Sequence, residues 1–278
     1  MHFKAYNLIF KSSIDLSDYG FIKVEEKNHD IEIILKQENC VLPKSQYCIH
    51  SLKSHYYVKD KVFFQVKNGN LIEIYPLIKD VDQIKQFIVN FPIALCLSQR
   101  SKFVMHASAV SKNGTMLIFC GKSHAGKSTL AYKFKQKSWD IVSEDIFVLD
   151  LKSGEILTSP PIIKLSKESC KQFNIDFEKG ISNNTGDRKF FLRDRNLNTQ
   201  CKTKYCYFLN WGDSNKIRQI SHQMAIKELY KYSFISSDKP SAQKVLLALK
   251  YFSFGKLIIK KNMLELDDVY KEVVKKLV

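Results

Sequence analysis

Residues 121–129 read Gly-Lys-Ser-His-Ala-Gly-Lys-Ser-Thr, and the interpretation of the whole chain depends on this stretch. It matches the pattern G-x-x-x-x-G-K-[ST], in which the glycines let consecutive backbone N–H groups turn inward around phosphate oxygens. The apolar run Met116–Cys120 precedes it and a helical pattern from Lys127 to about Lys137 follows it, which is the context that a phosphate loop needs. We therefore predict a nucleotide-phosphate site made by Gly121, Ser123, His124, Ala125, Gly126, Lys127, Ser128 and Thr129.

Two side chains of this loop have specific expected tasks. Lys127 is expected to reach the β- and γ-phosphates, and the Ser128 hydroxyl to ligate Mg²⁺. His124 stands where many such loops carry glycine, and histidine adopts a positive φ more readily than most residues but less readily than glycine. A phosphate contact by His124 and a merely tolerated substitution are both open, and we favour the second.

An acidic pair, Glu144-Asp145, follows Lys127 by 17 and 18 residues and comes directly after the short apolar run Ile141-Val142. A helix of about three turns followed by a strand returns the chain to the side of the phosphate loop. Carboxylates at that place hold Mg²⁺ or accept a proton from an attacking hydroxyl. A solvated surface pair is the alternative, and the distance from Lys127 favours the functional interpretation.

Two further features are candidates for the same site. His106 lies in an apolar strand whose hairpin partner leads into the loop, so a catalytic histidine and a buried structural one are equally open. Residues 187–195 contain three of the chain's five arginines. The planar guanidinium suits phosphate, so Arg188 and the adjacent Lys189 are candidate nucleotide ligands, with a salt-bridged surface turn as the alternative.

Composition limits the class of protein. The chain has 278 residues, 45% of them hydrophobic and 26% charged, as in ordinary globular proteins. It has no run of 18 apolar residues and no apolar secretion signal, so we expect a cytoplasmic protein without a membrane span. Seven scattered cysteines without a Cys-x-x-Cys pair indicate reduced thiols rather than disulfides or a zinc site.

The net charge of +16 raises the question of nucleic-acid binding. Only five of the 44 basic residues are arginine, and the lysines are spread along the whole chain. This distribution favours a lysine-rich solvated surface over a DNA-binding surface, and such a surface attracts an anionic substrate. The pattern leaves a homo-oligomer open.

The order of predicted elements gives an α/β fold in two parts. Residues 1–80 are expected to form a small β-rich N-terminal subdomain, with short strands at 21–24, 31–35, 62–66 and 71–75. Residues 81–278 are expected to form the catalytic domain, with helices from Asp80, from Phe91 to about Arg100, at 221–230, at 242–249 and at the C-terminus. Asn68-Gly69 and Asn113-Gly114 each predict a hairpin turn, and further strands are expected at 205–209 and 257–259, whereas residues 180–200 show no periodicity.

Three segments together resemble the HPr serine kinase/phosphorylase family. They are His106-Ala107-Ser108-Ala109-Val110, the loop at 121–129, and Val142-Ser143-Glu144-Asp145. The chain looks closest to diverged relatives of that family, including kinases encoded beside lasso-peptide precursors. The resemblance covers about residues 80–150, and the wider group is similar to phosphoenolpyruvate carboxykinase in its nucleotide-binding core.

The resemblance implies a carboxykinase-like P-loop core with a mixed sheet and transfer of a phosphoryl group from ATP, or GTP, to a serine hydroxyl. The acceptor it implies is a peptide or small protein, such as a ribosomally synthesised peptide during maturation. By motif position Lys127 and Ser128 bind phosphate and Mg²⁺, and Asp145 takes the metal position. Glu144 takes the position of the carboxylate that deprotonates the acceptor, and His106 that of a histidine near the reacting phosphate.

The sequence departs from the family in three ways. The family has two aspartates where this chain has Glu144-Asp145, and the longer glutamate shifts the expected base by about one bond length, a displacement that affects rate. His124 replaces a glycine, and the C-terminal segment typical of HPr kinases is not found, which puts HPr in doubt as the substrate.

Two other functions remain open, and a third is disfavoured. A kinase for a small hydroxylated metabolite differs from the peptide kinase only in the acceptor. A nucleotide-binding regulatory module would bind ATP without transfer. A transport ATPase would also use Gly-Lys-Ser-Thr-Leu, but it needs a Leu-Ser-Gly-Gly-Gln segment that the sequence lacks.

Overall fold

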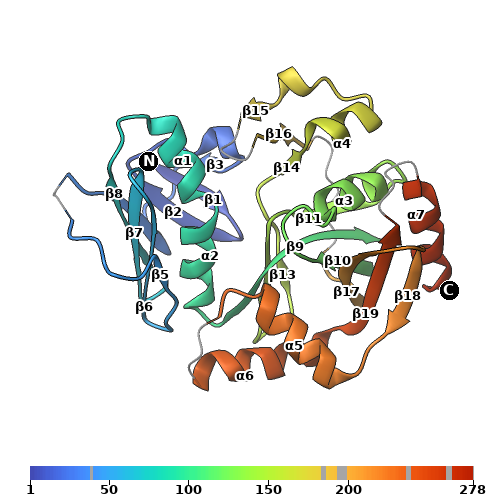
Figure 1. The fold of residues 1–278 in the computed structure, drawn as a ribbon. Coiled ribbons are helices and arrows are strands. Elements are labelled where there is room, and N and C mark those ends of the chain that lie inside the picture. The colour runs from blue at the N-terminus through green and yellow to red at the C-terminus, as the bar shows by residue number, and fades with distance from the viewer. Residues whose placement is uncertain (38–39, 183–185, 193–198, 236–238, 261–264, 278) are drawn as a thin grey trace. The chain divides into compact units, whose positions relative to one another are not determined.

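The structure is a computed structural model that describes residues 1–37, 40–182, 186–192, 199–235, 239–260 and 265–277. The fold is α/β with mixed sheets and few helices, which confirms the predicted class at this level (Figure 1). Contacts divide the chain into two units. The first comprises residues 1–104, 148–160 and 234–244, and the second residues 105–147, 161–233 and 245–278. The first unit therefore extends past the boundary predicted at residue 80.

The first unit is built on an eight-stranded sheet with the order β3-β1-β2-β4-β8-β7-β6-β5. Its strands are β1 (His2–Ala5), β2 (Leu8–Ser12), β3 (Ile22–Val24), β4 (Ile31–Leu35), β5 (Tyr47–Cys48), β6 (Lys53–Val58), β7 (Val62–Lys67) and β8 (Leu71–Pro76), with the short 3-10 helix η1 (Ser17–Tyr19). Strand β4 pairs in parallel with β2 and β8, and all other pairs in the sheet are antiparallel. The four predicted strands are present, whereas β1, β2, β5 and β6 were not predicted.

The two Asn-Gly turns form as predicted. Asn68 and Gly69 join β7 to β8 with φ of 53° and 66°, and Asn113 and Gly114 have φ of 49° and 76°. The second turn joins β9 (Lys102–Lys112) to β10 (Thr115–Cys120). A two-residue hairpin turn with positive φ at both positions has the twist of the flanking strands, and Asn and Gly are the residues that adopt it at least cost.

Two helices complete the first unit's main body. The Asp80 side chain caps α1 (Val81–Ile88) by accepting a hydrogen bond from the Gln83 N–H at 3.0 Å. Pro92 lies in the first turn of α2 (Phe91–Ser98), where its missing N–H costs no helical hydrogen bond. Helix α2 is apolar and packs on β6, β7 and β8. Both helices were predicted.

The second unit is built on the strands β9-β10-β17-β19-β18, with β11 (Asp140–Ser143) paired to β9. Strands β10, β17 (Thr203–Gly212) and β19 (Ser253–Lys260) are parallel, whereas β9 and β18 (Lys216–Gln219) pair antiparallel with their neighbours. Because the three parallel strands run the same way, their carboxyl ends meet at one edge of the sheet. Ligands bind at this edge in open α/β sheets.

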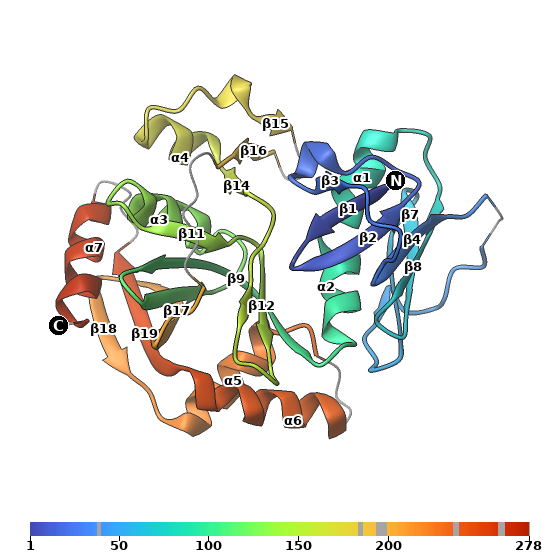
Figure 2. The ribbon, with the colours of Figure 1, turned by 180° about the vertical axis from the view of Figure 1, so that it is seen from behind.

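Two helices cover one face of this sheet. Figures 1 and 2 show α3 (Lys127–Lys135) beside α7 (Leu266–Lys275) over the strands. Leu130 and Phe134 of α3 pack in one buried cluster with Val269 and Val273 of α7. This burial fixes the direction of α3, and therefore the position of the loop from which it starts.

The remaining elements include a small three-stranded sheet, β14-β16-β15, whose strand β14 lies against α3 (Figure 2). They are β12 (Ile146–Asp150), β13 (Ile156–Leu157), β14 (Ile162–Leu165), α4 (Lys167–Gln172), η2 (Phe177–Lys179), β15 (Ile181–Ser182), β16 (Arg188–Phe191), α5 (His222–Tyr232), α6 (Lys239–Ala248) and η3 (Leu249–Tyr251). Strands β15 and β16 lie within residues 180–200, where the sequence shows no periodicity. In the described part of the chain, no helix has the length and apolar character that a membrane crossing requires.

Candidate functional site

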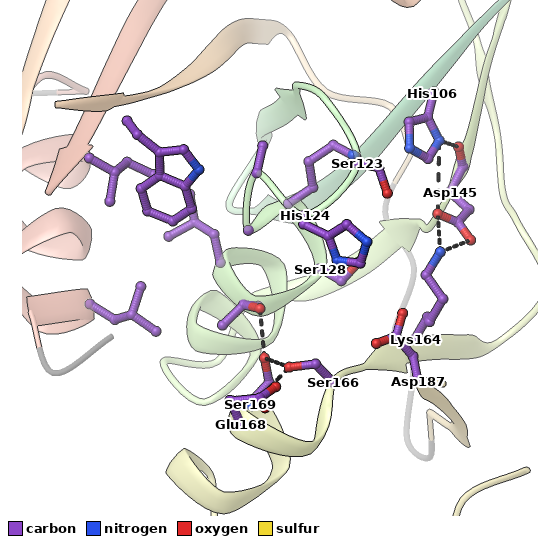
Figure 3. A pocket seen from close by; sticks show the side chains of 18 of the residues that line it. His106, Ser123, His124, Ser128, Asp145, Lys164, Ser166, Glu168, Ser169 and Asp187 are labelled. Carbon is purple, nitrogen blue, oxygen red and sulfur yellow. Dashed lines mark hydrogen bonds and ion pairs between the residues drawn. The ribbon is translucent and has the colours of Figure 1, made fainter. Parts of the chain in front are cut away.

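A pocket of about 310 Å³ lies at the carboxyl edge of the second unit's parallel strands, within the size range of small-molecule sites. It is lined by His106, Ser123, His124, Ala125, Gly126, Lys127, Ser128, Thr129, Leu130, Asp145, Lys164, Ser166, Glu168, Ser169, Asp187, Trp211, Ile259, Lys260 and Leu266. The predicted loop thus lies in the centre of the pocket, and Figure 3 shows Ser123, His124 and Ser128 there.

The loop has the predicted form of a tight connection between β10 and α3. A Cβ atom at Gly121 would lie 2.9 Å from the Ala125 Cβ, so only glycine fits without a shift of the backbone. Gly126 has φ of 90° and His124 has φ of 61°. His124 therefore adopts the left-handed backbone conformation that is typical of glycine at this position. This conformation costs histidine less conformational energy than it costs most other residues.

Lys127 is buried at the base of this loop. Its ammonium donates hydrogen bonds to the carbonyl oxygens of Gly121 at 3.1 Å and Lys122 at 3.0 Å, so the loop itself holds the charge in place. Burial lowers the pKa of Lys127, while the nearby carboxylates of Asp145 and Glu144 act in the opposite direction. The first turn of α3 starts at this residue and contributes the positive end of its dipole.

Pairing between β11 and β9 brings the acidic pair to the loop. Ser143 lies opposite Ala109 after a bulge, so Glu144 and Asp145 emerge beside Ser108 and His106. Ser108 and His106 lie two residues apart on β9 and therefore face the same side of the strand. The Ser108 hydroxyl donates to Glu144 Oε2 at 2.6 Å, and the Ser128 hydroxyl donates to Glu144 Oε1 at 2.5 Å.

The two carboxylates have opposite electrostatic surroundings. Burial, together with the charge of Asp145, raises the pKa of Glu144 to about 7. Burial disfavours ionisation of Asp145 as well, but the positive charges around it, first that of Lys164, hold the pKa of its carboxyl well below the usual range. Paired carboxylates whose pKa values are pushed apart are a common arrangement in acid–base catalysis.

The turn that carries Asp145 is strained. Asp145 has φ of 61°, and the Ile146 N–H donates to the Glu144 carbonyl at 2.7 Å across it. The buried Ser143 hydroxyl donates to the Ile146 carbonyl at 2.8 Å and fixes the turn from the other side. Left-handed backbone at a non-glycine residue costs about 1–3 kcal/mol and is concentrated at functional sites.

Two lysines of the small sheet act on the acidic pair, and one of them, Lys164, lines the pocket. Lys164 of β14 and Lys189 of β16 are register partners in an antiparallel pair. The Lys164 ammonium lies 3.1 and 3.2 Å from the two carboxylate oxygens of Asp145 (Figure 3). Lys189 is buried, which lowers its pKa to about 8 against the attraction of Asp145.

His106 contacts the acidic pair from the opposite side. Its Nδ1 lies 3.1 Å from the Asp145 carbonyl oxygen and 3.8 Å from Oδ1 (Figure 3). A carbonyl oxygen only accepts, so Nδ1 carries a proton, and Nε2 is then the ring nitrogen that can accept one. Burial lowers the pKa of His106, which favours the neutral ring, although the charge of Asp145 acts in the opposite direction.

Of the predicted nucleotide ligands, Gly121 and Lys189 do not line the pocket, and neither does Arg188. Its guanidinium pairs with Glu178 at 3.1 Å and lies over the Phe177 ring at 5.3 Å, as in the salt-bridged alternative. The reason is the alternation of a strand, because Arg188 and Lys189 are neighbours on β16 and face opposite sides. Two other arginines of this segment, Arg193 and Arg195, lie outside the described residues.

Several residues that line the pocket were not predicted, among them Lys164, Asp187 and Trp211, and Ser108, which bonds to Glu144, was not predicted either. For Lys164 the sequence holds a weak signal, since Ile162-Ile163-Lys164-Leu165 places a lysine between apolar residues in a strand pattern. No local feature shows that this strand faces the acidic pair, because its position depends on pairing with β16 and on packing against α3.

The residues around Ser128 fit a magnesium ion. The Ser128 hydroxyl and the carboxylates of Glu144 and Asp145 are hard oxygen donors, which Mg²⁺ prefers. Among the described residues, no group of three or more His, Cys, Asp or Glu side chains is arranged to hold a metal. Nucleotide-bound Mg²⁺ does not need such a group, because phosphates and water supply most of its ligands.

In comparisons with known proteins, no protein-family model matches the chain, and its sequence has no significant match among the curated proteins.

Proposed function

We propose that this protein is an ATP-dependent kinase that transfers the γ-phosphoryl group to a serine hydroxyl of a peptide or small protein. The observation that carries the proposal is the contact between the phosphate loop and the acidic pair, where the Ser128 hydroxyl donates to Glu144 at 2.5 Å. A phosphate-binding loop alone supports nucleotide binding, whereas carboxylates at its metal-binding serine support phosphoryl transfer. The fold that we propose for the second unit is the carboxykinase-like P-loop core, as the resemblance implies.

Charge in the pocket supports an anionic ligand. Lys127, Lys164 and Lys189 lie around Asp145 and Glu144, and Asp187 is a further carboxylate that acts on Lys164. A buried ammonium is stable only when it is compensated, and the phosphates of a nucleotide would add negative charge beside that of Lys127. Such preformed positive charge also stabilises the charge that develops on the transferring group.

Ser128 and Asp145 would hold a magnesium ion, which when bound neutralises phosphate charge. Asp145 suits this task because its low pKa keeps the carboxylate ionised. In this state Lys164 remains close to Asp145 and orients it, as its two contacts with the carboxylate suggest.

The remaining groups handle the proton and the acceptor. In the proposed step the acceptor oxygen bonds to the γ-phosphorus, the bond from phosphorus to the β–γ bridging oxygen breaks, and ADP leaves. The proton of the acceptor hydroxyl passes to Glu144, which the hydrogen bonds from Ser108 and Ser128 hold in position. Neutral His106, whose Nδ1–H is held by the Asp145 carbonyl, would offer Nε2 as a proton acceptor toward the reacting phosphate region.

Phosphoryl transfer from γ-labelled ATP tests the proposal. The protein is incubated with labelled ATP, Mg²⁺ and, in parallel, a protein lysate, serine-containing peptides or a pool of small hydroxylated metabolites. Lys127→Ala is the inactive variant, and Lys227→Ala, an exposed lysine of α5, is the matched control. We expect labelled serine in a peptide or protein with the wild type and Lys227→Ala and none with Lys127→Ala.

The other outcomes separate the alternative functions. Label confined to a small metabolite would replace the peptide acceptor by a metabolite acceptor. ATP binding without label in any acceptor would refute the kinase and leave a nucleotide-binding regulatory module.

A further inference from the structure

We propose that Trp211, with Ile259 and Leu266, forms the subsite for the nucleobase of the nucleotide whose phosphates lie in the loop. This inference rests on nucleotide binding by the proposed kinase, and it names the residue that recognises the planar base. Nothing in the phosphate-loop pattern indicates it, since the base lies beyond the groups that hold phosphate.

The sheet places these residues next to the loop. Trp211 and Ile259 are register partners near the ends of the parallel strands β17 and β19, and Leu266 is the first residue of α7. The loop starts at the end of β10, the other parallel neighbour of β17. A Cβ atom at Gly126 would lie 3.8 Å from Trp211 Cη2, so the indole edge adjoins the start of α3.

Exposure distinguishes Trp211 from the other tryptophan of the chain. Trp139 is 6% exposed within the core, whereas Trp211 is 46% exposed and lines the pocket. Ile259 and Leu266 are 4% and 7% exposed and form an apolar wall beside it. An open indole face against an apolar wall is a stacking surface for a flat aromatic ligand, and every nucleobase presents such a face.

The polarity of the pocket gives the orientation of the ligand. His106, Asp145 and Lys164 gather in one part of it (Figure 3), where they suit the γ-phosphate and the acceptor. Trp211 and Leu266 supply apolar surface in a different part, next to Gly126 and α7. A nucleotide has the same division into a charged end and a flat apolar end, so one molecule satisfies both parts. An apolar side chain of the acceptor is the competing occupant.

Tryptophan fluorescence tests the subsite directly, because the chain has two tryptophans. In the Trp139→Phe background Trp211 is the single tryptophan. We expect ATP with Mg²⁺ to quench its emission, and inorganic tripolyphosphate with Mg²⁺, which has no base, to leave it unchanged while still binding by calorimetry. Stacking of a base on an aromatic side chain contributes enough affinity that Trp211→Ala should weaken ATP binding by about 10- to 100-fold.

Further variants separate the subsite from a structural role. Trp211→Phe should retain most of the ATP affinity, and Trp211→Ala should bind tripolyphosphate as the wild type does. Wild-type ATP affinity in Trp211→Ala would overturn the base subsite and leave the proposed kinase intact. Equal loss of ATP and tripolyphosphate would also overturn it, since the substitution would then act on the loop. Failure of wild-type protein to bind either ligand would refute the subsite and the proposed function together.

Discussion

At the scale of single residues, the distinctive feature of this site is a buried glutamate bonded to the serine of a phosphate loop. Glu144 accepts hydrogen bonds from Ser108 and Ser128, while its neighbour Asp145 is surrounded by cations. The same two-residue unit therefore offers one carboxylate that takes up a proton near neutral pH and one that stays ionised. Replacing Glu144 by Gln tests directly whether the two carboxylates have these different roles.

Glu144→Gln should lower the rate of phosphoryl transfer by about 100- to 10,000-fold, because an amide cannot take up the proton of the attacking hydroxyl. ATP affinity and the thermal midpoint should stay close to those of the wild type, since Gln fills the same volume and still bonds both serines. Transfer rates, calorimetric ATP titration and thermal melts measure these three quantities. Glu155→Gln, on an exposed turn, is the matched control. Unchanged transfer in Glu144→Gln would remove the proposed base.

A second prediction concerns Lys189, whose replacement should weaken ATP binding and raise the stability of the folded protein. Its folded-state pKa is about 8 against the ordinary 10.5, so at pH 7 the folded protein bears the cost of a buried ammonium, on the order of a few kcal/mol. Lys189→Met should therefore unfold at higher denaturant concentration than the wild type at pH 7 and bind ATP more weakly.

The pH dependence of this difference follows from the direction of the shift. Between about pH 8 and 10.5 the unfolded chain keeps a proton that folded Lys189 has released, so wild-type stability rises relative to Lys189→Met. The stability advantage of the variant should shrink across that range. Lys179→Met, whose side chain is exposed, should show no such trend. A variant less stable than wild type at pH 7, or an advantage that grows with pH, would contradict the assignment.

At the scale of elements, the site depends on a loop whose ends are fixed by the sheet and by α3. Gly121→Ala should lower ATP affinity at least about tenfold, because the new Cβ would lie 2.9 Å from the Ala125 Cβ and displace the loop backbone. Gly114→Ala is the control: its Cβ meets no atom within 4 Å, and at φ of 76° it costs about 1–2 kcal/mol of stability. Calorimetry should show normal ATP binding in Gly114→Ala. Equal affinity in both variants would show that the loop tolerates the shift.

Local signals explain which elements could be predicted from the sequence. Asn-Gly pairs fixed both hairpin turns, Asp80 and Pro92 marked helix starts, and the phosphate loop required a strand before it and a helix after it. Strands β14 and β16 carry no comparable signal, because each is four residues long and depends on their mutual pairing, with β14 also packed against α3. Lys164 was missed for this reason. For Arg188 the nucleotide contact and the outward salt bridge stayed equally open, because the sequence did not give the phase of β16.

At the scale of the whole molecule, whose net charge is +16, the lysines fall into two groups, those at the surface and those buried at or near the pocket. Most lysines lie at the surface, many in ion pairs with neighbouring carboxylates, as the scattered pattern indicated. Among the side chains that the structure describes, the buried lysines are Lys127, which lines the pocket, and Lys189, whose charge acts on the pocket residue Asp145. Surface charge thus raises the local concentration of anions, whereas the pocket provides the specific site.

The central claim is that the pocket moves a phosphoryl group, and the position of the label in ATP tests it most directly. Purified protein, Mg²⁺ and the acceptor mixture are incubated in parallel with γ-labelled and α-labelled ATP, with and without a chelator. The account predicts acceptor label from γ-labelled ATP alone, its loss with the chelator and its absence in Lys127→Ala. Acceptor label from α-labelled ATP would mean nucleotidyl transfer, and no acceptor label from either would mean that the site binds nucleotide without transferring it; both results would contradict the account.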